Sequence, residues 1–191
     1  YTTDGTEPTS ASKVYAEPFL MDTKTTIKAA IINAKKSVSD SILINFHKAF
    51  NKPVTYNIPY SKSYPAASTY TLVNGYRGSL TYQDGQWQGF TSNIDVVIDL
   101  QKVDTIHLVQ ANFMQIIGPG VYMPKYIEVQ TSVDGVNYTN QGRDNNVVSP
   151  TESSLRFKDF KIPMKPTAAR FIKFVSKLQN GFQFIDEIIV E

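Results

Sequence analysis

The stretch Asp95-Val96-Val97-Ile98-Asp99-Leu100 decides the fold class. Its apolar residues Val96, Ile98 and Leu100 stand at every second position, and the other positions hold two acids, Asp95 and Asp99. Side chains of a β-strand point alternately to opposite faces, so a period of two is typical of a strand with one face on a core. The stretch therefore predicts a half-buried β-strand.

The same pattern extends along the chain in both directions. We predict further strands at residues 25–33, 41–46, 105–110, 127–132, 170–176 and 184–191. Turn dipeptides that can supply positive φ angles punctuate them at Asp4-Gly5, Asn74-Gly75, Asp84-Gly85 and Asp134-Gly135. Lys35-Lys36 with residues 37–39 reads as a hairpin connection, and no stretch carries a helical stripe. These signals predict an all-β protein, either a sandwich or a barrel.

Composition excludes several functional classes. The 191 residues carry a formal net charge of only +2, without the clustered basic surplus of a nucleic-acid binder. No apolar run approaches the roughly 20 residues that span a bilayer. The chain has no cysteine, which excludes disulfides, thiolate zinc sites and cysteine catalysis. Tyr1 opens directly into strand-like sequence without a signal peptide, so we expect a piece of a longer protein.

The N-terminal stretch carries the first resemblance. Tyr1-Thr2-Thr3-Asp4-Gly5-Thr6-Glu7-Pro8, followed by Tyr15 with Pro18 and then by Thr25 with Lys28-Ala29, resembles the C-terminal immunoglobulin-like domain of chitobiases and β-hexosaminidases. The resemblance covers residues 1–46 and implies a partial immunoglobulin- or fibronectin-III-like sandwich. The family domain begins with two further strands, which this sequence lacks upstream of Tyr1. We expect residues 47–51 to be a linker.

Residues 52–191 resemble a coagulation factor V/VIII type C (discoidin) domain, the jelly-roll β-sandwich of family 32 carbohydrate-binding modules. The resemblance rests on an ordered series of motifs: Asp84-Gly85, Trp87, Ile98-Asp99-Leu100, Ser132-Val133-Asp134-Gly135, Ala169-Arg170-Phe171-Ile172 and a closing strand with Glu187. Gln101 stands where the pattern usually has glycine. The Trp87-Gln88-Gly89-Phe90 variant looks like the version attached to family 20 glycoside hydrolases of gut-type Bacteroidetes, which implies an exported protein.

The discoidin resemblance also implies a structural Ca²⁺ between the first long loop and the last strand. The matching positions are Thr71, Asn74, Tyr76, Ser79, Asp186 and Glu187. Calcium takes six to eight oxygen ligands, so carbonyls and carboxylates suit it. Asn74 replaces the usual aspartate, and Arg77 in the same loop could partly neutralise the site. The alternative is that Asn74-Gly75 is only a positive-φ turn and Glu187 a surface carboxylate.

The resemblance further implies carbohydrate binding through loops at one end of the sandwich. Three loops combine aromatic, amide or guanidinium groups, which suit a shallow sugar site. The candidate residues are Asn112, Phe113, Tyr122, Arg143, Asn145 and Phe182. For Trp87, the only tryptophan, packing is favoured over sugar stacking. We expect Asp99 and Arg170 to form a polar pair at strand ends that stabilises the fold.

No catalytic constellation is recognisable. His47 and His107 are the only histidines and lie in different parts of the chain, without metal-ligand spacing. The sequence thus predicts a non-catalytic accessory region of a β-N-acetylhexosaminidase-like glycoside hydrolase. Its expected partners are a glycan of the galactose or N-acetylhexosamine type and the catalytic domain of the parent chain, with no nucleic acid or membrane. The alternative is a structural spacer or protein-docking domain that binds no glycan.

Overall fold

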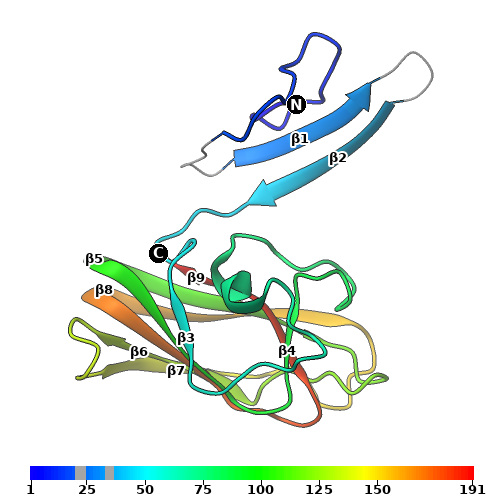
Figure 1. Ribbon diagram of the computed structural model, residues 1–191. Coiled ribbons are helices and arrows are strands. Elements are labelled where there is room, and N and C mark those ends of the chain that lie inside the picture. The colour runs from blue at the N-terminus through cyan, green and yellow to red at the C-terminus, as the bar shows by residue number, and fades with distance from the viewer. Residues whose placement is uncertain (20–24, 33–36) are drawn as a thin grey trace. The chain divides into compact units, whose positions relative to one another are not determined.

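The computed structural model describes residues 1–19, 25–32 and 37–191. It divides the chain into two compact units, Tyr1–Phe46 and His47–Glu191 (Figure 1). Among the described residues, no helix is long and apolar enough to cross a membrane.

The first unit contains one antiparallel pair of strands. β1 (Thr25–Ile32) pairs with β2 (Ser37–Ile44) in a register that joins Thr25 to Ile44. Of the predicted hairpin connection, Lys35-Lys36 lies outside the described residues, whereas residues 37–39 belong to β2 and not to the turn. On its other side, β1 forms a bridge between Lys28 and Thr2. Near the chain start, Tyr1 stacks on Phe19 with ring centroids 4.9 Å apart.

The second unit is an antiparallel β structure with one short 3₁₀ helix. Its elements are β3 (Val54–Tyr56), η1 (Ser68–Val73), β4 (Gln88–Phe90), β5 (Ile94–Gln115), β6 (Tyr126–Ser132), β7 (Thr139–Asn145), β8 (Arg156–Ser176) and β9 (Gln183–Val190). The strand order is β4-β9-β5-β8-β6-β7, and β3 pairs with β5. The predicted all-β fold is confirmed.

The two long strands β5 and β8 pair with each other in two stretches that are separated by a break. The stretches on either side of this break belong to the two halves of the unit. They pair from Ile94↔Ser176 to Asp99↔Phe171, lose register, and pair again from Asp104↔Ala169 onward. Gln101, in the irregular stretch, has a φ of 66°. Beside this break the Arg170 guanidinium donates to both Asp99 oxygens, at 2.8 and 2.9 Å. The ion pair therefore joins β5 and β8 at the register break between them.

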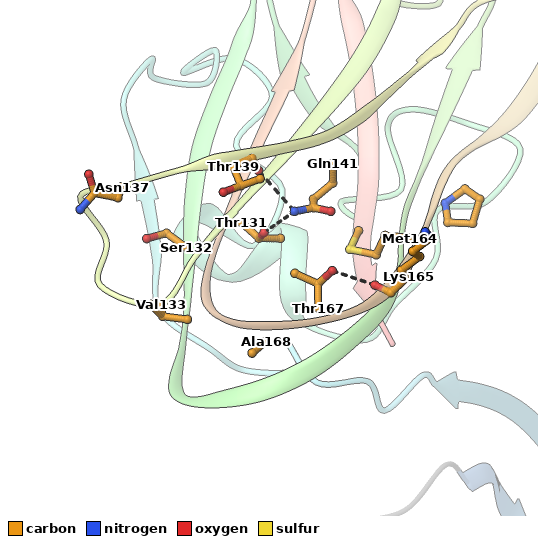
Figure 2. Close-up of a pocket in the computed structure, with 11 residues that line it drawn as sticks. Thr131, Ser132, Val133, Asn137, Thr139, Gln141, Met164, Lys165, Thr167 and Ala168 are labelled. Carbon is orange, nitrogen blue, oxygen red and sulfur yellow. Dashed lines mark hydrogen bonds between the residues drawn. The ribbon is translucent and has the colours of Figure 1, made fainter.

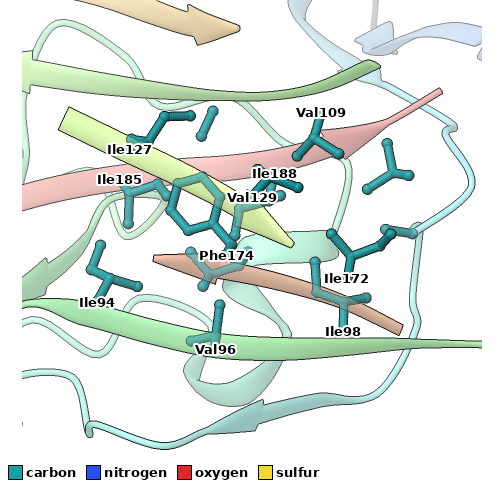
Figure 3. Packing of buried hydrophobic residues seen from close by; sticks show 14 of the residues in the cluster. Ile94, Val96, Ile98, Val109, Ile127, Val129, Ile172, Phe174, Ile185 and Ile188 are labelled. Atoms are coloured by element: carbon teal, nitrogen blue, oxygen red, sulfur yellow. The ribbon is translucent and has the colours of Figure 1, made fainter. Parts of the chain in front are cut away.

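The main core lies between the two halves (Figure 3). Ile94, Val96, Ile98 and Leu100 of β5 are buried in the predicted alternation. Figure 3 shows the first three of these among side chains from the later part of β5 and from other strands: Val109, Ile127, Val129, Ile172, Phe174, Ile185 and Ile188. This main apolar core thus packs the strands of the second unit against one another.

Residues 47–51, predicted as a linker, are an integral part of the second unit. The His47 side chain is only 2% exposed, and Ala49 is fully buried. The Lys48 backbone N–H donates to the carbonyl of Val190 at 2.9 Å. The sequence hides this packing because five residues, His-Lys-Ala-Phe-Asn, are too few to show a strand or helix period.

Candidate functional site: a polar groove and two buried carboxylates

Two predicted sugar-binding residues, Asn112 and Phe113, lie inside the fold instead of on a loop. β5 continues to Gln115, and both residues belong to it. Phe113 is fully buried and meets Phe160 edge to face, while the Asn112 amide donates to Asp186 at 3.0 Å. Neither residue is exposed to a ligand, so this part of the predicted site is wrong.

Arg143 and Asn145 lie on β7, because the expected amide-rich loop pairs with β6 as a strand. The Arg143 guanidinium donates twice to Glu128, at 2.9 and 2.6 Å, and lies 3.8 Å from the centroid of the Tyr126 ring. The hydrogen bonds to Glu128 raise the pKa of Arg143. Its charge is thus already engaged within the β6–β7 hairpin.

Tyr122 and Phe182 are the predicted residues that the structure brings together. The Tyr122 N–H donates to the Phe182 carbonyl at 2.8 Å. Phe182 is half-buried and packs edge to face on Tyr64 and against Phe184, with centroids 5.5 and 5.8 Å away. The Phe182 ring therefore belongs to a small apolar cluster, and the three loops do not assemble the predicted site.

A pocket of about 620 Å³, here called the polar groove, lies between the β6–β7 hairpin and a bulge of β8 (Figure 2). The bulge arises where Ile106 pairs with Thr167 but Leu108 pairs with Pro163, so residues 164–166 are displaced from the ladder. Eleven residues line the groove: Thr131, Ser132, Val133, Asn137, Thr139, Gln141, Pro163, Met164, Lys165, Thr167 and Ala168.

Hydrogen bonds hold the groove's polar side chains in place. The Gln141 amide donates to the Thr131 hydroxyl oxygen at 2.8 Å and to the Thr139 carbonyl at 3.5 Å. Across the groove, the Thr167 hydroxyl donates to the Lys165 carbonyl at 2.7 Å (Figure 2). Within the described part of the chain, the Gln141 carbonyl oxygen has no partner. The groove can therefore offer one fixed acceptor together with several hydroxyl groups.

Lys165 is the only charged residue lining the groove. It lies on the bulge, is exposed, and forms no ion pair with any residue that the structure describes. The sequence carries no signal for this site, because hydroxyl and amide side chains on three separated segments have no recognisable spacing.

The second feature is a pair of buried carboxylates on β9, Asp186 and Glu187, both with fully buried side chains. At Asp186, one oxygen accepts from Arg77 Nε at 3.1 Å and from the Gly78 N–H at 3.0 Å, and also from Asn112. Burial raises the pKa of Asp186, and the Arg77 charge counteracts part of that rise. Asp186 thus has both charge and hydrogen-bond compensation.

The cost of burying the Glu187 carboxylate is offset by hydrogen bonds from neutral donors. Its Oε1 accepts from the Gly75 N–H at 2.9 Å and pairs with His47 Nε2 at 2.8 Å. Burial lowers the pKa of His47 to about 4, and the Val190 N–H points at its Nδ1, so the neutral ring carries its proton on Nε2. Burial raises the pKa of Glu187 well above its usual value. Glu187 Oε2 has no hydrogen-bond partner among the described residues.

The structure brings the predicted calcium residues together but does not arrange them for calcium. Asn74 Oδ1 accepts the Tyr76 N–H at 2.9 Å, the Ser79 carbonyl accepts the Trp87 indole N–H, and the Thr71 hydroxyl donates to Ser68. The loop directs N–H groups and the Arg77 guanidinium at the carboxylates, where a cation would need oxygen atoms. In the described part of the chain, no three acidic or histidine side chains group as metal ligands. Among the carboxylate oxygens of this set, Glu187 Oε2 alone has no hydrogen-bond partner in the described residues, so the side chains do not by themselves supply the oxygen ligands that calcium requires.

Comparison with known families gives a match for the first part of the chain only. Residues 1–42 match the family described as the chitobiase/beta-hexosaminidase C-terminal domain. A search of curated proteins found no match.

Similar solved structures confirm the β-sandwich class. Chitosan-binding module 1 from the chitosanase/glucanase of Paenibacillus sp. IK-5 has a TM-score of 0.54 at 14% identity, over 77% of this chain and 99% of its own. A Streptococcus pneumoniae fucose binding module has a TM-score of 0.51 at 21% identity, over 76% and 94%. The lectin domain of lectinolysin, solved with Lewis B antigen, has a TM-score of 0.51 at 15% identity, over 76% and 96%.

Another similar structure is much longer than this chain. The match to SpGH29 has a TM-score of 0.51 at 16% identity and covers 76% of this chain but only 27% of that one. At such identities, these likenesses establish the fold.

Proposed function

We propose that this chain is a non-catalytic accessory region of an exported glycoside hydrolase related to chitobiases and β-N-acetylhexosaminidases, and that its second unit binds glycan in the polar groove. The observation that carries the proposal is the groove itself, with an amide and several hydroxyl groups, on a fold that carbohydrate-binding modules share. The family match of residues 1–42 supports the parent enzyme, whose catalytic domain would be the partner.

The groove suits a sugar because its donors and acceptors are fixed before a ligand arrives. The Gln141 amide is held by Thr131, so its carbonyl oxygen can accept a sugar hydroxyl without a further loss of side-chain freedom. Thr131 itself is only 3% exposed, so its hydroxyl serves to orient the Gln141 amide within the groove. Each such bond contributes about 0.5–1.5 kcal/mol net.

The affinity should be low. None of the groove's lining residues is aromatic, so a sugar ring gains no stacking contact there. A few hydrogen bonds set against the cost of association favour a dissociation constant nearer millimolar than nanomolar. Tethering would still serve a parent enzyme, because an attached module raises the effective concentration of a polymeric substrate.

The ligand class follows from the groove's charge and from the resemblance. We propose a galactose or N-acetylhexosamine residue, whose hydroxyl and acetamido groups match the amide and hydroxyl lining. Lys165 adds one cation without an ion partner among the described residues, so a sugar that also carries a carboxylate should bind more tightly than its neutral counterpart.

The test is an NMR titration of the complete chain with galactose, galacturonate, N-acetylgalactosamine, N-acetylglucosamine and chitobiose. Shifts should concentrate at residues 131–141 and 163–168. Gln141→Ala should weaken binding about tenfold, the equivalent of about 1.4 kcal/mol. Lys165→Gln should abolish the preference for galacturonate over galactose.

Gln179→Ala, in the loop next to Phe182, is the matched control and should bind like the unmodified chain. Weaker binding by Gln179→Ala together with normal binding by Gln141→Ala would move the site to the predicted loops. No shifts at tens of millimolar sugar would favour the alternative of a spacer or protein-docking domain.

A further inference from the structure

We propose that Arg77 takes the place of a bound cation in the second unit. Its guanidinium, together with the N–H groups of Gly75 and Gly78, fastens the loop at residues 74–79 to the carboxylates of β9. The folded state of this unit would therefore need no calcium. The inference concerns the loop that the discoidin resemblance assigns to a metal, and it does not depend on glycan binding.

Arg77 bridges two strands from one loop. Its Nε donates to Asp186 on β9 at 3.1 Å, and its terminal Nη2 donates to Asp159 on β8 at 2.7 Å. The Arg77 side chain is 31% exposed, whereas that of Asp186 is fully buried. The planar guanidinium can present several N–H groups in fixed directions, which lets one side chain hold two carboxylates.

Asp186 has the compensation that a buried carboxylate requires. An isolated buried charge is costly unless it is paired and hydrogen-bonded. Arg77 supplies the positive charge, and Gly78, Asn112 and the backbone N–H of Glu187 supply the remaining hydrogen bonds, at 3.0, 3.0 and 2.6 Å. A metal ion at this carboxylate would have to displace the guanidinium of Arg77.

The contact between Arg77 and Asp186 also holds the part of the loop that packs against Trp87. Gly78 lies directly against the Trp87 ring, and the neighbouring Ser79 carbonyl accepts the indole N–H at 3.0 Å. Trp87 in turn belongs to a small apolar cluster with Met114, Val121 and Phe184. Arg77 is thus the anchor of a loop that holds the only tryptophan in place.

The experiment measures the melting temperature of the complete chain in millimolar calcium chloride and in excess EDTA, with calorimetric titration of calcium as a second measurement. The unmodified chain should melt at the same temperature in both solutions and should show no calcium binding heat. Arg77→Met keeps the apolar stem but removes the charge, and should lower the melting temperature by roughly 5–10 °C in EDTA. Calcium should restore part of that loss, because Asp186 and Asp159 then lack a cation.

Arg156→Met is the matched control, since Arg156 pairs with Glu152 on the surface and is 51% exposed. It should melt within about 1–2 °C of the unmodified chain. A lower melting temperature of the unmodified chain in EDTA would overturn the proposal. So would an Arg77→Met variant that is as stable as the control, or one that calcium does not stabilise. If Arg77→Met does not fold, Arg77→Lys can replace it. This variant keeps the positive charge but loses the planar guanidinium with its several N–H groups, and calcium should raise its melting temperature to a smaller degree.

Discussion

The Trp87 indole lies against the ring of Phe157, with centroids 5.8 Å apart and planes 22° from parallel. Trp87 is 1% exposed, whereas Phe157, on the outer side of the pair, is 39% exposed. Together with its hydrogen bond to the Ser79 carbonyl, this makes the only tryptophan a packing residue, as its isolation in the sequence suggests.

Replacing Trp87 should therefore affect stability first. We expect Trp87→Ala to lower the free energy of unfolding by about 3–5 kcal/mol, because a large buried side chain is lost and a cavity remains. Phe157→Ala should lower it by less, since that ring is partly in water already. Urea unfolding followed by circular dichroism measures both values. Equal losses would mean that the two rings share their burial evenly, contrary to the structure.

Gly78 should not tolerate a side chain. A Cβ atom at Gly78 would lie 2.1 Å from two atoms of the Trp87 ring, Cε2 and Nε1. Gly78→Ala must displace the ring or the loop, and overpacking of this kind costs roughly 1–3 kcal/mol of unfolding free energy.

Gly118 provides the control for Gly78. It has no neighbouring atom within 4 Å of its ideal Cβ position, so Gly118→Ala should be neutral or slightly stabilising. A Gly78→Ala variant as stable as Gly118→Ala in the same unfolding assay would show that the loop can move away without cost.

The turn at Asp134 should make stability depend on pH in acid. The Asp134 carboxylate accepts from the N–H groups of Val136 and Asn137, the Asn137 amide and the Ser132 hydroxyl, each at 2.8 Å. These bonds, the backbone bond to Asn137 first, lower the pKa of Asp134 far below its usual value. Protons then bind the unfolded chain more readily than the folded one, so stability falls as the pH drops below about 4.

Comparison with Asp134→Asn isolates this effect. Above about pH 5 the unmodified chain should exceed the variant in unfolding free energy by a constant amount, since Asp134 is ionised in both states. Below about pH 4 the difference should shrink. Denaturant titrations between these pH values measure it, and a difference that stays constant down to about pH 2 would contradict the assignment.

Phe182 should act as a packing residue and not as a sugar platform. Its contacts with Tyr64 and Phe184 predict that Phe182→Ala lowers the unfolding free energy by roughly 1–3 kcal/mol, less than for a fully buried ring. Glycan affinity, measured by the same titration on the folded variant, should not change. A variant of normal stability with reduced affinity would instead return the site to the loops at one end of the sandwich.

Much of the fold could be predicted from the sequence because strands with one buried face show their period directly. Val96, Ile98 and Leu100 are buried where the alternation predicts them. The ends of the strands were harder to predict. β5 continues to Gln115 through Asn112 and Phe113, because pairing with β8 and β9 continues there, and pairing between distant segments leaves no local mark.

For the predicted calcium site, the position of the loop and the atoms that the loop presents are two separate questions. The discoidin resemblance implies that the loop around Asn74 lies near Glu187, and in the structure the Gly75 N–H donates to that carboxylate. The sequence could not show whether the loop presents carbonyl oxygens or N–H groups, which depends on backbone orientation. Nor could it show that Arg77 reaches Asp186 and Asp159, residues more than 80 positions away.

The sequence by itself determined the all-β fold and the packing role of its tryptophan, because period, turn residues and composition are local properties. Only the tertiary structure decided where a ligand could bind. The polar groove takes its lining from two strands of a hairpin and a bulge in β8, and the pairing that unites them follows from burial of the shared core. Hydroxyl and amide groups become a site only when that packing directs them toward one space.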